Sequence, residues 1–175
     1  LTIEFECAVA PGGKEGPTVI NFGNGKTINI NVTSAGDLKV NKSSGTYNGS
    51  TGLIEYTVKV EAVYGAVTGI TLSDKITSGN AQMSGSGSYY KLDGTPLASR
   101  PTSLAAGEGF LWKYYVKVNA GVIDLTKADG RVQITNIVTV SGKTGPDNSQ
   151  SISKTDDDTH TINYQNLKKE AKSID

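Results

Sequence analysis

Three polar residues, Lys42, Asp74 and Asn136, lie in three separate strand-like segments. Each occupies the alternate positions that the apolar residues of its segment also occupy. Because side chains alternate between the two faces of a strand, all three are expected to point into a core. There a Lys amine loses its proton more easily and a carboxyl holds its proton more tightly. A neutral amine can attack a neighbouring Asn carbonyl, while a protonated Asp polarises that carbonyl and shuttles protons as ammonia leaves. The three residues therefore predict an amide cross-link between Lys42 and Asn136, with Asp74 as acid and base.

The segments that carry these residues differ in how firmly they predict burial. Lys42 ends an apolar face that starts at Leu38, and Asp74 ends one that starts at Ile70. At a strand end the side chain can instead meet solvent, so that alternative stays open for both residues. Asn136 lies in the middle of segment 131–140, and a buried amide without a partner costs a few kcal/mol. Its partner is the main question that the sequence raises.

The rest of the chain has the composition of an all-β protein. It holds 175 residues, of which 21 are Gly, and its apolar runs are dominated by Val, Ile, Thr and Tyr. Residues 78–108 are rich in Gly and Ser, with one short strand candidate at 88–92. With about seven strands, residues 37–141 have the size of an immunoglobulin-like β-sandwich with Greek-key connections. The other predicted strands are 1–9, 18–22, 26–33, 53–61, 67–74 and 109–118. The apolar face of 53–61 consists of Ile54, Tyr56, Val58 and Val60, and that of 109–118 consists of Phe110, Trp112, Tyr114, Val116 and Val118.

Charge and cysteine content exclude several classes of protein. Seventeen basic and seventeen acidic residues give a net charge of zero, which disfavours a nucleic-acid or anionic-membrane binder. No apolar run approaches the roughly 18 residues of a spanning helix, so no membrane insertion is expected. Cys7 is the single cysteine and is interpreted as a buried thiol, which leaves no internal disulfide. No cofactor and no metal are expected.

A weak internal repeat suggests the domain organisation. Segment 26–43 resembles 160–173, and segment 3–21 resembles 114–136, with a period of roughly 130 residues. We therefore predict that 1–35 are the C-terminal strands of a preceding repeat, or extra strands of the same sandwich. Residues 36–141 form a complete domain, and 142–175 form a linker and the first strand of a following repeat. Asn21 and Lys172 would then be cross-linking groups of the neighbouring repeats, and one larger sandwich is the alternative.

Four segments together carry a resemblance to a known family; they are 37–42, 54–60, 67–74 and 134–140. The pattern resembles the repeated immunoglobulin-like domains of Gram-positive surface adhesins and pilins, most closely the collagen-adhesin A-region type with a self-formed Lys–Asn isopeptide bond. In that family the Lys lies in the first strand, the catalytic Asp follows, and the Asn lies in the last strand. Here the spacings are 74 − 42 = 32 and 136 − 74 = 62 residues. The family's final strand reads Asn-Thr-Ala-Thr-Val, whereas Ile137 and Val138 stand here.

The resemblance implies a structural or adhesive module of a cell-wall-anchored bacterial protein, located outside the cell. Its only reaction would be a single turnover on itself, so it would not be an enzyme. Its partners would be neighbouring repeats and a host matrix protein or glycan. The alternatives are a carbohydrate- or matrix-binding sandwich without a cross-link, using Tyr89 and Tyr90, or an accessory domain of a secreted glycosidase.

Other polar residues fit this chemistry less well. Lys39, Lys59 and Glu55 fall on the parity opposite to the core residues, so they are disfavoured as nucleophiles or as the proton shuttle. The run 156–158 consists of three Asp residues and is interpreted as a solvated linker, because its spacing fits no calcium loop. His160 is the single histidine and has no nucleophile motif beside it, which disfavours a hydrolase triad.

Overall fold

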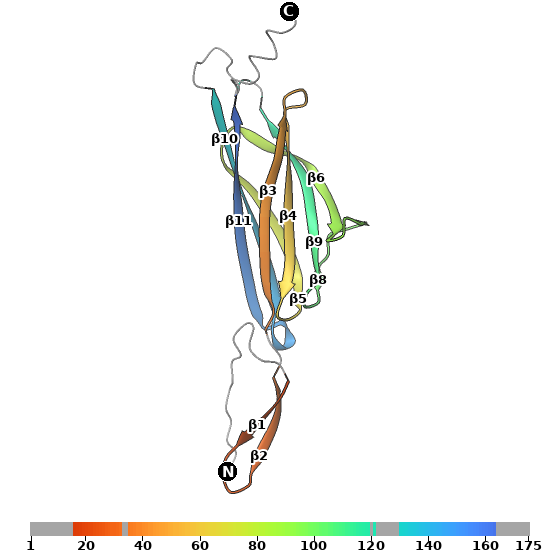
Figure 1. Ribbon diagram of the computed structural model, residues 1–175, viewed down its shortest axis with the longest axis vertical. Helices are drawn as coiled ribbons and strands as arrows, with labels where there is room; N and C mark the ends of the chain where they lie inside the picture. Colours follow the sequence, from red (N-terminus) through yellow and green to blue (C-terminus); the bar gives the residue numbers. More distant parts are fainter. Residues whose placement is uncertain (1–15, 33–34, 120, 122–129, 164–175) are drawn as a thin grey trace, which may run out of the picture.

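The computed structural model describes residues 16–32, 35–119, 121 and 130–163 (Figure 1). Their regular secondary structure consists of strands joined by turns and loops, apart from one short 3-10 turn at Pro146–Asn148, and they contain no helix that is long and apolar enough to cross a membrane. The strands are β1 Gly16–Asn21, β2 Thr27–Val32, β3 Asp37–Asn48, β4 Leu53–Val63, β5 Val67–Ser78, β6 Ala81–Lys91, β7 Pro96–Leu97, β8 Ser103–Leu104, β9 Gly109–Val118, β10 Arg131–Thr144 and β11 Gln150–Asn163.

Two antiparallel sheets pack face to face as an immunoglobulin-like β-sandwich, which confirms the predicted fold class. One sheet has the order β3-β4-β9-β6-β7 and the other has the order β11-β10-β5-β8. The chain changes sheet between β4 and β5, β5 and β6, β7 and β8, β8 and β9, and β9 and β10. As a result, strands that are distant in sequence face each other across one core.

Strict alternation of side chains fills that core. Every second residue of β4 is buried, from Ile54 to Ala62, and β9 and β10 show the same period. Burial of such strand faces is the main stabilising term, at about 25 cal/mol for each Å² of apolar surface. The largest fully buried side chains come from both sheets and include Tyr56, Tyr114, Phe110, Ile70 and Ile134. The predicted inward parity of β4, β5, β9 and β10 is therefore correct.

The sandwich extends beyond its predicted end at residue 141. Strand β10 continues to Thr144, and β11 pairs with β10 along its whole length, from Thr144↔Gln150 to Arg131↔Asn163. Residues 142–163 are therefore part of this domain, and not a linker to a following repeat. The sequence concealed β11 because several of its inward positions are polar, so the apolar alternation that marks a strand is missing.

The N-terminal hairpin stands apart from both sheets of the sandwich. Among the described strands, β1 and β2 pair only with each other, in the register Ile20↔Ile28. The two strands agree with the predicted segments 18–22 and 26–33. The predicted strand 1–9 with Cys7, and the C-terminal segment with Lys172, lie outside the described residues.

Strand β6 is longer than predicted, since it starts seven residues before position 88. Its Gly-rich sequence forms a bulge between Ser84 and Ser88, where the register with β9 shifts. Gly87 has a φ of +78°, and Trp112 packs over it and donates its indole N–H to the Ser86 carbonyl at 3.1 Å. The glycines that suggested a loop serve to bend a strand around a large aromatic side chain.

We expect Gly87→Ala to destabilise the fold more than Gly85→Ala. Both residues have positive φ, so both substitutions strain the backbone by about 1–3 kcal/mol. Only at Gly87 would the new Cβ meet Trp112 Nε1 at 2.5 Å and the Lys113 carbonyl at 2.6 Å, whereas Gly85 has open space. Urea unfolding of the two variants should show a larger loss at Gly87; equal losses would contradict the packing of Trp112.

Candidate cross-linking site

Strands β3, β5 and β10 bring the three predicted residues together. Lys42 Nζ lies 2.5 Å from Asp74 Oδ1, and their side chains are 0% and 4% exposed. Asn136 is 0% exposed and lies on β10. The next inward residue of β10 is Val138, which is the Cα partner of Asp74 on β5. Neither Lys42 nor Asp74 ends its strand, because β3 runs to Asn48 and β5 to Ser78. The solvent-exposed alternative for these two residues is therefore wrong.

Tyr114 supplies the partner of the buried amide. Its hydroxyl donates to Asp74 Oδ1 at 2.6 Å and accepts from Asn136 Nδ2 at 3.1 Å. Lys42, Asp74, Tyr114 and Asn136 thus form one continuous chain of polar contacts between the two sheets. The sequence predicted only that Tyr114 faces the core with the apolar residues of β9. The signal that could have identified it is that a buried Tyr hydroxyl usually needs a partner.

Removing the Tyr114 hydroxyl should be costly. In Tyr114→Phe the Asn136 amide loses its acceptor and Asp74 loses a donor, so the free energy of unfolding should fall by about 1–3 kcal/mol. Tyr115→Phe is the matched control, because the Tyr115 hydroxyl bonds Glu55 at 3.0 Å on the exposed face, where the cost should stay within about 0.5 kcal/mol. Urea unfolding of both variants measures the difference, and an equal effect would contradict the bridge.

The surroundings of Lys42 lower the pKa of its amine below the ordinary value. Burial lowers the pKa of the amine, while the hydrogen bond to Asp74 and the charges of Asp74, Asp158 and Asp156 oppose that shift. The Nζ atom also lies 5.1 Å from the Tyr56 ring centroid and 5.5 Å from that of Tyr114. A lowered pKa increases the share of the free amine, which is the nucleophilic form.

Both tyrosines next to Lys42 keep their protons. Burial raises the pKa of the Tyr56 hydroxyl and of the Tyr114 hydroxyl, and the negative charge of Asp74 adds to the effect in both. Tyr114 is therefore available as a hydrogen-bond donor to Asp74 throughout the physiological pH range. The two rings stack with centroids 5.8 Å apart and exclude water from the amine.

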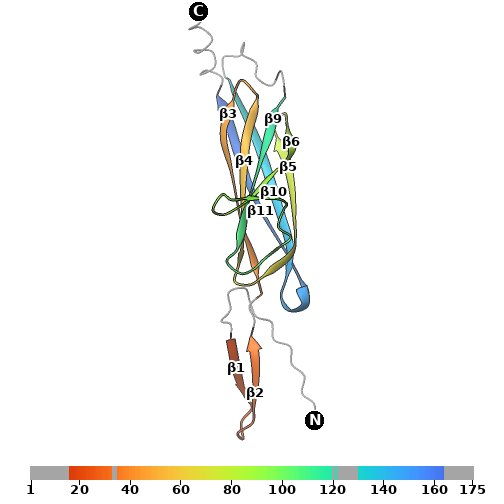
Figure 2. The ribbon, with the colours of Figure 1, turned by 90° about the vertical axis from the view of Figure 1, so that its right-hand side faces the viewer.

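Strand β11 lies along β3 and covers this edge of the site. The edge strands β3 and β11 belong to different sheets and run side by side (Figure 1, Figure 2). Side chains connect them, since Asp156 Oδ2 accepts from the Lys42 backbone N–H at 2.6 Å and Ser44 Oγ lies 3.1 Å from His160 Nδ1. Burial lowers the pKa of His160. The interpretation of 156–158 as a solvated linker is therefore wrong, because Asp156 accepts a hydrogen bond from the Lys42 backbone.

Three buried polar atoms near this site have no hydrogen-bond partner among the described residues: Asn136 Oδ1, Tyr56 OH and Asp158 Oδ2. Buried polar groups are nearly always paired, so each such atom needs an explanation. Asp74 bonds Lys42 and Tyr114 and leaves the Asn136 carbonyl oxygen unbonded. This differs from the sequence prediction, in which Asp74 itself polarises that carbonyl.

The residues disfavoured by parity lie away from the site. Lys59 pairs with Glu61 at 2.9 Å on the outer face, Glu55 accepts from Tyr115, and Lys39 is exposed.

Asn21 is exposed in the β1–β2 hairpin, where its side chain accepts from the Gly23 N–H at 2.9 Å. The structure does not bring Asn21 to any of the three central residues.

Tyr89 and Tyr90 occupy successive positions of β6, so their side chains point to opposite faces. Tyr89 stacks on Trp112 with centroids 6.3 Å apart and meets Phe110 edge-on at 6.2 Å. Tyr90 lies on the other face, with Lys113 Nζ 5.5 Å from its ring centroid. The two rings therefore do not form one platform for a sugar or a peptide.

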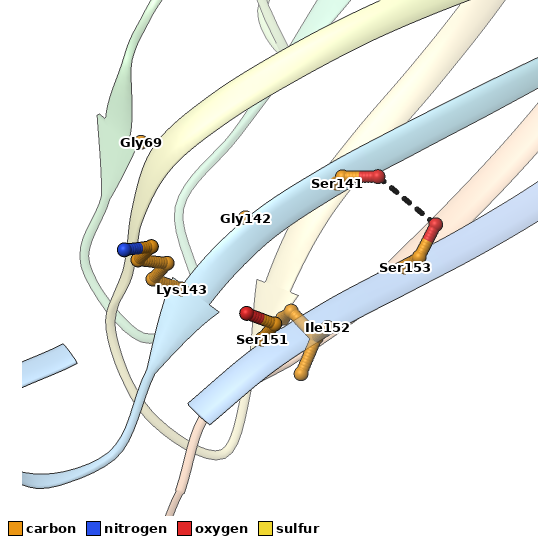
Figure 3. A pocket seen from close by; sticks show the side chains of 7 residues that line it. All are labelled: Gly69, Ser141, Gly142, Lys143, Ser151, Ile152 and Ser153. Carbon is orange, nitrogen blue, oxygen red and sulfur yellow. Dashed lines mark hydrogen bonds between the residues drawn. The ribbon is translucent and has the colours of Figure 1, made fainter. Parts of the chain in front are cut away.

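A pocket of about 350 Å³ lies at the end of the sandwich where β10 turns into β11 (Figure 3). Ser141, bonded to Ser153 at 2.9 Å, and Lys143 supply its polar groups, beside Gly69 of β5. Asn136 is five residues up β10 from Ser141, which is about 17 Å along a strand. The pocket is thus distinct from the candidate cross-linking site.

No protein-family model and no curated protein matches this chain. Among solved structures, the crystal structure of the yeast GGA1 GAE domain is similar with a TM-score of 0.41 and 9% sequence identity. The match covers 82% of this chain and 96% of the yeast domain.

Proposed function

We propose that this chain is a structural or adhesive module of a cell-wall-anchored bacterial adhesin or pilin, stabilised by a self-formed amide bond between Lys42 and Asn136. The observation that carries the proposal is the buried chain of contacts from Lys42 through Asp74 and Tyr114 to Asn136. A nucleophile, a carboxyl group and an amide from three strands meet in one core. The resemblance of the strand motifs to adhesin repeats supplies the biological setting.

The arrangement suits a proton-coupled displacement. Lys42 gives a proton to Asp74, and the neutral amine attacks Cγ of Asn136, where the new C–N bond forms. The bond from Cγ to Nδ2 then breaks and ammonia leaves. Tyr114 lies between Asp74 and Nδ2, so it can relay the proton that the leaving nitrogen needs. The product contains no buried ammonium, which removes the desolvation cost of that charge.

The position of the cross-link suits a module under tension. Strand β3 begins at one end of the sandwich and β11 finishes at the opposite end (Figure 1, Figure 2). A bond from Lys42 to Asn136 joins β3 to β10, so it closes a loop of 136 − 42 = 94 residues. The bond would join the first strand of the sandwich to its penultimate strand, and β11 stays outside the loop. The proposal places the module outside the cell, in series with neighbouring repeats, with a host matrix protein or glycan as partner.

Intact mass spectrometry tests the bond. We expect the purified protein to be lighter than its sequence by one ammonia, and Lys42→Ala to have its full calculated mass. Lys39→Ala is the matched control, since it removes an exposed Lys three residues earlier on β3 and should keep the deficit. A full calculated mass for the wild-type protein would refute the cross-link.

A further inference from the structure

Two of the unpartnered oxygens belong to residues that oppose each other directly on β10 and β11. Asn136 and Asp158 are direct Cα partners in this antiparallel pair. Directly opposed residues project to the same face with their Cβ atoms about 5 Å apart. Asn136 Oδ1 and Asp158 Oδ2 are both buried, and neither has a hydrogen-bond partner. Two adjacent acceptors cannot satisfy each other unless one of them carries a proton.

Asp158 is a second carboxyl group at this site, and it has no cation of its own among the described residues. Lys42 is already paired with Asp74, so an ionised Asp158 would leave a negative charge without a partner of its own. Lys42, Tyr56 and His160 are titratable groups close enough to interact with Asp158. The groups on the strands around it include a third carboxyl, Asp156 of β11. One proton shared with Asn136 Oδ1 would satisfy both oxygens and remove the excess charge.

We propose that Asp158 is the acid that donates to the Asn136 carbonyl oxygen, and that Asp74 is the base that serves Lys42. This inference rests on the proposed function and deepens it, because the sequence assigned both tasks to Asp74. The reactive carbonyl is activated from β11, while the amine is deprotonated from β5. A group so placed stabilises the negative charge that develops on the oxygen as the amine attacks.

The division of work balances in atoms and protons. The Lys42 ammonium gives one proton to Asp74, its amine attacks Cγ, and the carbonyl electrons move to Oδ1, which takes the Asp158 proton. Asp74 passes its proton through Tyr114 to Nδ2, which leaves as ammonia with the electrons of its bond. Asp74 then takes the second proton of the attacking nitrogen. Oδ1 becomes a carbonyl oxygen again and returns the proton to Asp158.

Infrared spectroscopy of unreacted protein tests where the proton lies. Lys42→Ala cannot form the bond, so it holds Asn136 as the free amide. At neutral pH we expect a protonated-carboxyl band that persists in Lys42→Ala/Asp74→Asn and is lost in Lys42→Ala/Asp74→Asn/Asp158→Asn, where Asp74 cannot contribute a band of its own. A band lost with Asp74, or the absence of any such band, would overturn the assignment. This readout does not depend on whether the wild-type protein forms the bond, so it separates failure of the inference from failure of the proposed function.

The rate of bond formation supplies the second test, followed by intact mass after refolding. Asp158→Asn should slow the loss of ammonia about a hundredfold, which is within the range for one general acid. Asp157→Asn is the matched control, because that side chain is exposed on the other face of β11 and should leave the rate unchanged. An Asp158→Asn protein that folds and reacts at the wild-type rate would overturn the inference and leave the cross-link itself intact.

Discussion

Lys42→Ala is expected to lower the free energy of unfolding by about 4–5 kcal/mol, because the proposed covalent loop of 94 residues would no longer constrain the unfolded chain. The estimate treats the amide bond as disulfide loops are treated. Guanidinium unfolding, followed by tryptophan fluorescence from Trp112, measures the change. Lys39→Ala should stay within about 0.5 kcal/mol of the wild-type protein.

The destabilisation caused by an unpaired Asp74 carboxylate must be distinguished from the destabilisation caused by the loss of the loop. In Lys42→Ala the buried Asp74 loses its cation, which adds a cost of its own. Lys42→Ala/Asp74→Asn removes that charge, so the loss that remains in the double variant reports the loop. A double variant as stable as the wild-type protein would show that no covalent loop stabilises the fold.

Mechanical unfolding should reveal the same loop, because the cross-linked protein releases less contour length when it is stretched. Stretched from its two ends, the cross-linked protein cannot extend the 94 residues between Lys42 and Asn136. At about 3.4 Å for each residue, Lys42→Ala should therefore release about 320 Å more chain than the wild-type protein. Single-molecule force spectroscopy of tandem copies measures this difference in contour length.

A second feature of the force record follows from β11. Because β11 follows Asn136 in the chain, β11 and the part of β10 beyond Asn136 lie outside the loop and can still unfold. The wild-type protein should extend by about 90 Å for the 163 − 136 = 27 residues beyond the bond. Equal extensions for the two proteins would contradict a load-bearing cross-link.

The sequence predicted the inner face of the sandwich well, because strand parity is a local property. Lys42, Asp74 and Asn136 each occupy the face that alternation assigned to them, and the sandwich follows from the same pattern in β4, β9 and β10. Asn136 was the most informative residue, since a mid-strand amide on an apolar face needs a partner. The structure places it in the network of contacts that this requirement implies.

The partners themselves could not be predicted, because they depend on register between strands that are distant in sequence. Nothing in the local pattern distinguishes Tyr114 from the other aromatic residues of β9. Asp158 was missed for a different reason, since three consecutive Asp residues are typical of a solvated linker. Only the pairing of Asn136 with Asp158 shows that this carboxyl group faces the core.

The most direct test of the central claim is to digest the protein and identify the peptides that contain Lys42 and Asn136 by tandem mass spectrometry. The account predicts one branched species in which the two peptides are joined and one ammonia is missing, and trypsin should not cleave after Lys42. Two separate linear peptides, with an unmodified Lys42 and an intact Asn136, would contradict it.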